Sequence, residues 1–390
     1  MKTIHISLSC LIISLLLGLT SCFRGEESII RVPIQEISKV PHKTQNLIVV
    51  TLDGFRWQEV FNGADSVLLF NYNYTSVDSG WLRNKFWDTD YTVRRKKLMP
   101  FFWNTLVNRG KIFGNRKLGN FVDVRNPFRI SYPGFSEIFT GYVDYNINSN
   151  LFGENPNYNV LEFINGQSGF RNNNVSAFCV WDEFSDILNS KRNGLNVICG
   201  AKDGMPASGY YLRDSMAISI NKQLPSLGLY PVIGSPSNYD REIYALAKSD
   251  LVRTHPRVLY IAFLGTDTYG HLGRYDSYLI DAYNINLMLN DLWNFIDSSA
   301  VYKDKTTLFI TCDHGRGNGA EWISHGADVS HSEDTWFAII GPDTKPLGEI
   351  GTSQQFYQMQ FARTFSSLLG WEVSGVKEMG TSIQAVMDNN

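Results

Sequence analysis

The sequence predicts an α/β fold built on a doubly wound, mostly parallel sheet with helices on both faces. Three short runs are apolar throughout, as strands covered on both sides must be: Asn46–Leu52, Val258–Gly265 and Thr306–Cys312. Segments with helical spacing of apolar residues alternate with such runs, the clearest being Tyr239–Arg253 and Tyr275–Ile296. In a sheet of this kind the carboxyl ends of the strands open onto one edge, where ligands bind.

Further elements fill the chain between these strands. Helices are predicted at Lys97–Asn108, Phe135–Thr140, Val160–Ile164, Asp182–Ser190 and Gln358–Leu369, and strands within Lys111–Val124 and at Val175–Val180, Leu195–Cys199 and Thr335–Ile340. Ser66–Arg94 is aromatic and polar without a clear period, and we expect it to lie near the mouth of a site. Its part from Phe70 to Tyr91 is expected to line the pocket.

The first 45 residues are expected to precede the folded domain. Lys2 is followed by an apolar run, Leu8–Leu19, that is short for a bilayer span and has the form of a signal-peptide core. The run ends in Leu19-Thr20-Ser21-Cys22, which resembles the lipobox of bacterial lipoproteins. We therefore predict a lipoprotein signal peptide at 1–21 and a tether at 22–45, with an ordinary signal peptide as the alternative.

The rest of the chain suits one large domain. Hydrophobic residues make up 43% of the sequence, enough for a sizeable core, and residues 46–390 are predicted to form a catalytic domain with insertions at about 66–96 and 201–237. With a net charge of −3 and no cluster of basic residues, the sequence does not indicate a surface that binds nucleic acid. The three cysteines beyond residue 22 lie in apolar strand-like runs and are interpreted as buried residues, not as a disulfide framework.

Three aspartates stand where apolar strands are predicted to end. Asp53 and Asp313 follow their strands directly, and Asp267 comes shortly after Val258–Gly265. A single aspartate in this position is usually a turn former. Three of them at one edge of a parallel sheet instead indicate a ligand-binding site.

Three histidines and one serine extend this set. His271 lies four residues after Asp267, His314 follows Asp313 directly, and His325 comes eleven residues later. Ser131 precedes a helical segment, where it either caps the helix or presents its hydroxyl beside the helix N-terminus. Imidazoles combined with carboxylates suit ions of the zinc type, and the set could hold two of them about 4 Å apart, the spacing used for displacement at phosphorus. His331 is the alternative to His325 as the last metal ligand.

The ordered set of Asp, Ser, Asp-x-x-x-His, Asp-His and His resembles the alkaline phosphatase superfamily of metalloenzymes over roughly residues 46–369. Within it, the chain looks most like the type I phosphodiesterase/nucleotide pyrophosphatase group and the related phosphomutase branch. The resemblance implies that one ion is bound by Asp53, Ser131, Asp313 and His314, and the other by Asp267, His271 and His325. Two divalent ions are implied, with zinc favoured and manganese as the alternative.

The implied activity is metal-dependent hydrolysis of phosphate mono- or diesters. Ser131 would attack phosphorus in line, and water would then hydrolyse the phosphoseryl intermediate. A phosphotransferase similar to phosphoglycerate mutase, a sulfatase-like hydrolase and a non-catalytic envelope binding protein are the alternatives. Sulfatases have an arginine where this chain has Phe135, which cannot supply a positive charge.

One position departs from the diesterase pattern. Ser131 is followed by Tyr132-Pro133-Gly134, whereas diesterases have Phe-Pro-Asn after their nucleophile, so an asparagine that helps to hold the phosphoryl oxygen is missing. Arg129 and Arg316, together with Arg125, are candidates for binding the substrate in its place, with solvated surface arginines as the alternative.

The predicted lipoprotein signal peptide also restricts where the protein would be located and which substrates it would meet. A lipid on Cys22 would anchor the enzyme in the cell envelope, either periplasmic or exposed at the surface. The partners expected there are the membrane, through the lipid, and small-molecule, glycan or lipid phosphoesters.

Overall fold

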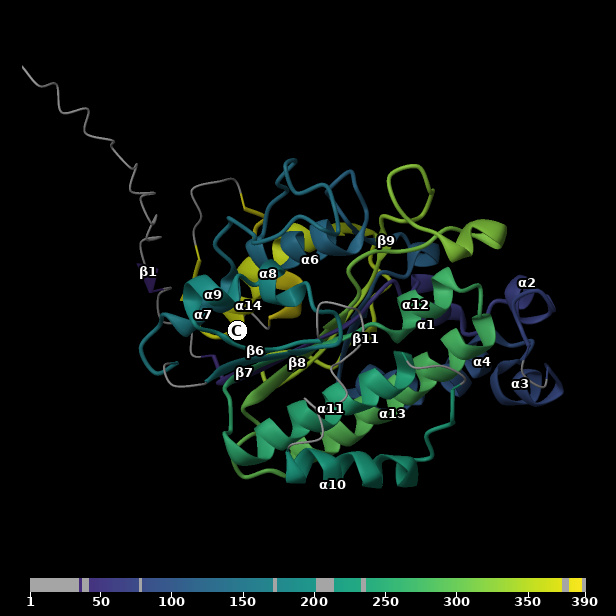
Figure 1. The fold of residues 1–390 in the computed structure, drawn as a ribbon, viewed down its shortest axis with the longest axis horizontal. Coiled ribbons are helices and arrows are strands. Elements are labelled where there is room, and N and C mark those ends of the chain that lie inside the picture. The colour runs from purple at the N-terminus through teal and green to yellow at the C-terminus, as the bar shows by residue number, and fades with distance from the viewer. Residues whose placement is uncertain are drawn as a thin grey trace, which may run out of the picture.

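The structure, a computed structural model, describes residues 35–36, 42–76, 79–170, 174–200, 214–232, 236–373 and 379–387. A central sheet lies between two layers of helices (Figure 1), which confirms the predicted fold class. The predicted signal peptide, Cys22 and most of the predicted tether lie outside the described residues. Among the helices that are described, none combines the length and the apolar character needed to span a bilayer.

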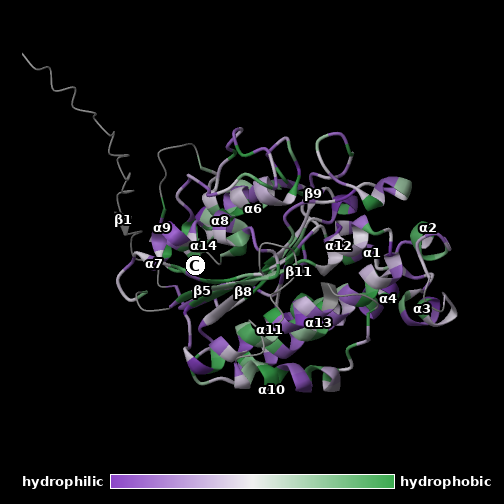
Figure 2. Cartoon of the chain, in the orientation of Figure 1, coloured by the Kyte–Doolittle hydropathy of each residue, from purple (hydrophilic) through white to green (hydrophobic). Residues whose placement is uncertain are grey.

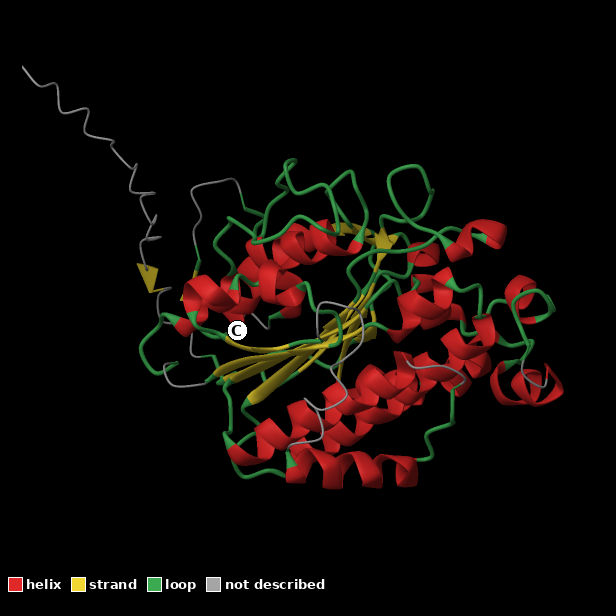
Figure 3. Cartoon of the chain, in the orientation of Figure 1, coloured by secondary structure: helices red, strands yellow, loops and turns green. Residues whose placement is uncertain are grey.

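The central sheet has eight strands in the order β11-β3-β10-β8-β2-β7-β5-β6 (Figure 3). Five neighbouring strands are parallel: β8 (Thr306–Thr311), β2 (Asn46–Leu52), β7 (Val258–Phe263), β5 (Val175–Cys179) and β6 (Asn196–Ile198). Beyond β8, strand β10 (Phe337–Ile340) is antiparallel to both of its neighbours, and β3 (Gly110–Phe113) and β11 (Gly348–Glu349) complete the sheet.

The central strands are apolar on both faces because helices cover both faces (Figure 2). Alternate residues of β2 belong to different cores, with Ile48 and Val50 in one and Leu47 and Val49 in the other. One layer contains α10 (Ser215–Gln223), α11 (Pro236–Arg253) and α13 (Tyr275–Ser298). The other contains α6 (Ser131–Thr140), α7 (Val160–Asn165), α8 (Phe184–Ile187), α9 (Ser190–Asn193) and α14 (Phe361–Leu368).

The segment without a clear period contains short helices. Asp65 and Asp90 cap α2 (Ser66–Leu69) and α4 (Tyr91–Leu98) with their side chains, and α3 (Ser79–Phe86) lies between them. Together with α1 (Trp57–Asn62) they form one end of the molecule (Figure 1).

Three predicted elements are interrupted in the structure. The helix predicted at Lys97–Asn108 is wrong as a single helix: α4 ends at Leu98 because the residue before Pro100 leaves the helical region, and a π-helical turn (Phe102–Leu106) and α5 (Val107–Arg109) follow. The helix predicted at Asp182–Ser190 is likewise divided into α8 and α9 by Asn189, whose φ is +43°.

The strand predicted at Thr335–Ile340 is divided between two sheets. Its first part is β9 (Asp334–Thr335), which joins β4 (Asn120–Asp123) and β12 (Gln354–Tyr357) in a small sheet, whereas its second part is β10. Between them the buried Trp336 donates its indole N–H to the carbonyl of Phe55, 2.8 Å away.

The remaining described elements are small. β1 (Gln35–Glu36) pairs with β13 (Trp371–Glu372), and 3₁₀ turns occur at Arg116–Leu118, Leu224–Leu227, Gly319–Ile323, Gln358–Gln360 and Gln384–Val386.

Candidate metal and nucleophile site

The three aspartates predicted from the strand ends meet at one edge of the sheet. Strand β2 lies in register between β7 and β8, so that Asp53 and Asp313, which follow β2 and β8, come together. Asp267 is on α12 (Gly265–His271), which begins two residues after β7. Because α12 is a helix and not the turn that the sequence suggested, Asp267 and His271 lie on the same helical face.

Gly54 makes this convergence possible. Its φ of +57° is strained for other residues, and a Cβ here would lie 2.7 Å from Oδ1 of Asp267. The Gly54 N–H donates to Oδ1 of Asp313 at 3.0 Å. The turn after β2 therefore contacts both neighbouring aspartates.

The first cluster, called the inner group, consists of Asp53, Ser131, Asp313 and His314. Nε2 of His314 lies 3.4 Å from Oδ1 of Asp53 and 3.4 Å from Oδ2 of Asp313. The Ser131 hydroxyl is 3.2 Å from the same Nε2 and 3.4 Å from the same Oδ1 of Asp53. All four residues are buried.

The structure rules out a capping role for Ser131. Helix α6 begins at Ser131 itself, its N-cap residue is Ile130, and no side chain makes the cap hydrogen bond. The hydroxyl is therefore directed to Asp53 and His314. Behind it, the buried Glu137 accepts hydrogen bonds from the backbone N–H groups of Arg125 and Asn126, which fixes the segment before the helix.

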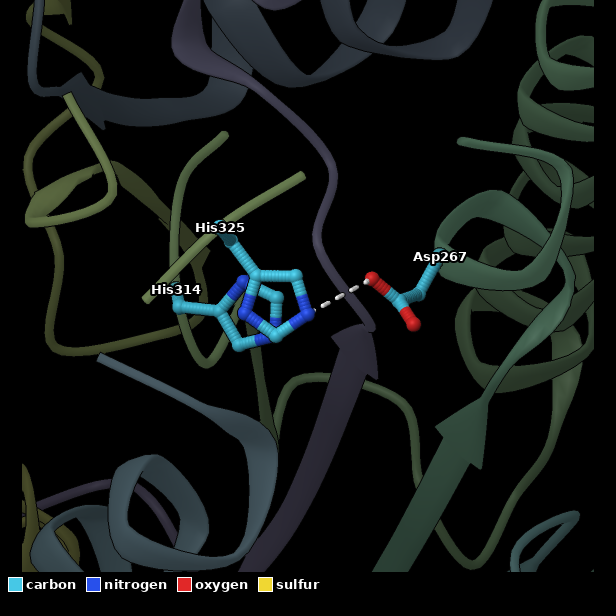
Figure 4. A group of neighbouring side chains, drawn as sticks. All are labelled: Asp267, His314 and His325. Carbon is cyan, nitrogen blue, oxygen red and sulfur yellow. Dashed lines mark ion pairs between the residues drawn. The ribbon is translucent and has the colours of Figure 1, made fainter. Parts of the chain in front are cut away.

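The second cluster, called the outer group, consists of Asp267, His271 and His325. Nε2 of His271 is 3.3 Å from Oδ2 of Asp267 and 3.0 Å from Nε2 of His325, which is itself 3.7 Å from Oδ1 of Asp267. Figure 4 shows the overlapping rings of His325 and His314 facing Asp267, and the two imidazole rings are stacked with centroids 3.8 Å apart. The inner and outer groups are therefore contiguous.

Backbone carbonyls orient two of the imidazoles. Nδ1 of His314 is 2.9 Å from the carbonyl of Gly315, and Nδ1 of His325 is 3.1 Å from the carbonyl of Arg129. A carbonyl only accepts hydrogen bonds, so each Nδ1 carries the proton and each Nε2 offers its lone pair to the site. Histidines that bind metals are commonly held in this way.

Burial makes the inner group electrostatically unfavourable on its own. Burial, together with a neighbouring carboxylate, raises the pKa values of Asp53 and Asp313 well above the usual range. Oδ2 of Asp313 is buried and has no hydrogen-bond partner in the described part of the chain. A bound cation would satisfy this oxygen and offset both carboxylates, so the inner group fits a divalent ion.

In the outer group the charge of the carboxylate is already compensated by the protein. Burial would raise the pKa of Asp267, but the charge of Arg316 and a hydrogen bond from His271 hold it well below its usual range. Burial, together with His314, lowers the pKa of His325 to about 2, so this imidazole is neutral. A neutral imidazole is the form that binds metals. Ligand atoms of Asp267, His314 and His325, like those of Asp53, Asp313 and His314, all lie within 4.8 Å of one another.

The predicted arginines have protein partners in the structure. Arg316 is fully buried and pairs with Asp267, and the guanidinium of Arg129 pairs with Glu333 at 3.2 Å. The guanidinium of Arg125 lies over the Tyr357 ring. Their contact with a substrate stays a prediction.

Gly134 explains why the asparagine of the diesterase pattern is absent. A Cβ at this position would lie 2.6 Å from the carbonyl oxygen of Asp313, so α6 approaches the end of β8 too closely for a side chain.

Parts of the predicted aromatic segment pack on themselves. Phe70 and Trp87 form an edge-to-face pair, whereas Tyr74 packs its ring against Trp322 in the loop that precedes His325.

Sequence reasoning missed a buried pair of carboxyl groups behind α12. Asp240 accepts hydrogen bonds from the N–H groups of Leu264 and Gly265, at 2.9 and 3.0 Å. A Cβ on Gly265 would touch the carboxylates of both Asp240 and Asp281. Neither aspartate follows a strand, so no pattern in the sequence marked them.

The structure separates the two histidines that competed for one role. His325 lies in the outer group, whereas Nδ1 of His331 is 2.9 Å from Oδ2 of Asp334. If the outer group binds a metal, His325→Ala should lower kcat/KM for a phosphoester about 100-fold or more, and His331→Ala less than about fivefold. Steady-state kinetics of both variants decide it, and the opposite ranking would show that His331 is the ligand.

The similarity of this chain to known proteins is a similarity of fold and not of sequence. No family model matches the sequence, and no curated protein matches it. The wild-type alkaline phosphatase PafA superposes with a TM-score of 0.58 at 12% identity, over 90% of this chain and 100% of that one. This chain has an alkaline phosphatase-like fold.

Two further solved structures share this fold with the chain. A phosphonate monoester hydrolase from Silicibacter pomeroyi has a TM-score of 0.54 at 11% identity, over 88% of this chain and 76% of its own. A 2-O GAG sulfatase has a TM-score of 0.51 at 12% identity, over 88% and 74%. These structural neighbours are members of the alkaline phosphatase/sulfatase superfamily, and at such identities the likeness establishes the fold alone.

Proposed function

We propose that this protein is a metal-dependent hydrolase of phosphoric esters that works through a phosphoserine at Ser131. The observation that carries the proposal is the Ser131 hydroxyl, which is held within 3.4 Å of both Asp53 and His314 in a group that fits a cation. The alkaline phosphatase and the phosphonate monoester hydrolase among the structural neighbours support this class of reaction.

The inner group would hold one ion and the outer group another, with zinc favoured by the imidazoles and manganese as the alternative. When bound, such ions supply the positive charge that lowers the pKa of the Ser131 hydroxyl and offsets charge on the phosphoryl oxygens.

The residues of the chain would then perform two displacements. Ser131 Oγ forms a bond to phosphorus while the bond from phosphorus to the leaving oxygen breaks. The hydroxyl proton is lost to water, because Oδ1 of Asp53 and Nε2 of His314, the acceptors nearest to Oγ, would be engaged by the ion. The N-terminus of α6, where Ser131 lies, directs its partial positive charge to the oxygens that become negative. The oxygen of a water molecule then forms a bond to phosphorus while the bond from phosphorus to Oγ breaks, Oγ regains a proton from that water, and phosphate is released from a monoester or a phosphomonoester from a diester.

The surroundings of α6 favour phosphate over sulfate. Phe135 occupies the place of the sulfatase arginine, is fully buried, and packs edge-on against Phe184 with ring centroids 4.6 Å apart. No cationic side chain can replace it there without disrupting that core.

A panel of three substrates tests the proposal: p-nitrophenyl phosphate, its bis-ester and p-nitrophenyl sulfate. We expect the full chain to hydrolyse at least one of the two phosphate esters, to lose that activity with a chelator, and to regain it with Zn²⁺ or Mn²⁺. Hydrolysis of the sulfate alone would assign the protein to the sulfatase class. Full activity after chelation and dialysis would contradict a metal enzyme.

We also propose that the mature protein is anchored at the cell envelope by a lipid on Cys22, on the strength of Leu19-Thr20-Ser21-Cys22. Phosphoesters that reach the envelope would then be its substrates. Mass spectrometry of the mature N-terminus tests this, because an unmodified Cys22 or cleavage elsewhere would refute the anchor without affecting the proposed chemistry.

A further inference from the structure

We propose that Arg316 sets the affinity of the outer group for a divalent cation, because its guanidinium holds Asp267 in an ion pair with which the cation must compete. The inference rests on the proposed function in that it takes both groups to be metal sites. It predicts two unequal sites, a tight one at the inner group and a weaker one at the outer group.

The guanidinium of Arg316 is fixed in place on several sides. It pairs with Oδ1 of Asp267, while its Nε and Nη2 donate to the carbonyls of Trp322 and Ile323 at 2.8 and 2.7 Å. It also lies so close to Gly270 that a Cβ there would be 2.6 Å from Cζ. The side chain is fully buried. The positive charge therefore stays beside Asp267 when a cation arrives.

The two groups differ in how their carboxylates are compensated. Asp267 is the one carboxylate of the outer group, and Arg316 already neutralises it. The inner group has two carboxylates, and in the described part of the chain neither Asp53 nor Asp313 forms an ion pair with a lysine or arginine, since their basic neighbour is the imidazole of His314. A cation in the outer group would be attracted by one carboxylate and repelled by one guanidinium. A cation in the inner group would be attracted by two carboxylates. Because Asp267 and Arg316 are both buried, one such charge should change affinity strongly.

Arg316 also holds the loop that carries His325 in place. Through this contact alone, replacing Arg316 would weaken cation binding. The loop has other hydrogen bonds, however. Gly317 N–H donates to Ser324 at 3.1 Å, Gly326 N–H donates to the Ser332 hydroxyl at 3.1 Å, and Nδ1 of His325 donates to Arg129. These contacts should keep His325 in place after Arg316 is replaced, so the loss of charge should dominate.

Calorimetric titration of the metal-free full chain with Zn²⁺ tests the inference. We expect two binding events in the wild type, of which His271→Ala removes the weaker. Arg316→Gln should tighten that weaker event tenfold or more and change the tighter one less, because Arg316 pairs directly with Asp267 but acts on Asp53 only at longer range. Arg129→Gln is the matched control because Arg129 contacts the same loop but pairs with Glu333, and it should change neither event more than threefold.

Arg316→Lys separates charge from shape. It keeps the positive charge, so its weaker event should stay within about threefold of the wild type. It also provides a test if Arg316→Gln does not fold, since a tenfold gain in Arg316→Lys would show that charge is not the cause.

The outcomes distinguish this inference from the proposed function. Equal affinities in the wild type, or a weaker outer site in folded Arg316→Gln, would overturn the role of Arg316 and leave a two-metal enzyme standing. A chain that binds no Zn²⁺ or Mn²⁺ at all would overturn both.

Discussion

Ser131→Ala should lower kcat for the best phosphoester at least about 10³-fold, because the proposed reaction passes through a bond between Oγ and phosphorus. The variant should fold and should still bind a cation at the outer group, since the Ser131 hydroxyl contacts Asp53 and His314 but no residue of the outer group in the described structure. Steady-state kinetics and metal analysis of the purified variant provide the measurement.

Ser136→Ala is the matched control. Ser136 lies on the same helix and is equally buried, but its hydroxyl binds the side chain of Asn155, 3.0 Å away, instead of the site. Its turnover should stay within about threefold of the wild type. Full activity in Ser131→Ala would remove Ser131 from the role of nucleophile.

Asp313→Asn should also abolish turnover, again by about 10³-fold or more, and yet stabilise the metal-free protein at neutral pH. The amide oxygen can still accept from the Gly54 N–H, but the buried charge beside Asp53 is gone. Each unit by which burial raises a pKa corresponds to about 1.4 kcal/mol, so the gain in the free energy of unfolding should be at least about 1 kcal/mol.

The size of this gain depends on pH. Folding raises the pKa of Asp313 above the usual 3.8, so the metal-free wild type has its full stability below that value and loses it as pH rises through the folded-state pKa. The two proteins should therefore be about equally stable in acid and diverge toward neutral pH. Urea unfolding with a chelator at several pH values measures this. Asp297→Asn is the contrasting variant: Arg109 lowers the pKa of Asp297, so its replacement should destabilise the protein toward neutral pH. A destabilised Asp313→Asn would show that the inner group is not strained by its charge.

Strand positions were predictable because burial on both faces leaves a continuous apolar run. The prediction Asn46–Leu52 coincides with β2, and the predicted strand at Thr306 ends one residue beyond β8. Since parallel strands end at one edge, the meeting of Asp53 with Asp313 also followed from the sequence. Ser131 joined them only through the resemblance of the ordered set, because its position before a helical segment, taken alone, favoured a helix cap.

Features fixed by tertiary contacts were not predictable. The break at Trp336 depends on a hydrogen bond to Phe55, which is remote in sequence. The ion pair between Arg316 and Asp267 depends on α12 being a helix packed against the loop after β8, where the sequence suggested a turn. Sequence proximity to the site made Arg316 a candidate for binding the substrate, but it gave no indication that the side chain is buried against a metal-site candidate.

The stereochemical course at phosphorus tests the central claim most directly. A phosphorothioate ester made chiral with oxygen isotopes would be hydrolysed by the metal-loaded protein in isotopically labelled water, and the configuration of the product determined. Two successive in-line displacements, first by Ser131 Oγ and then by water, predict net retention. Net inversion would mean that water attacks the substrate directly, and would contradict a phosphoserine at Ser131.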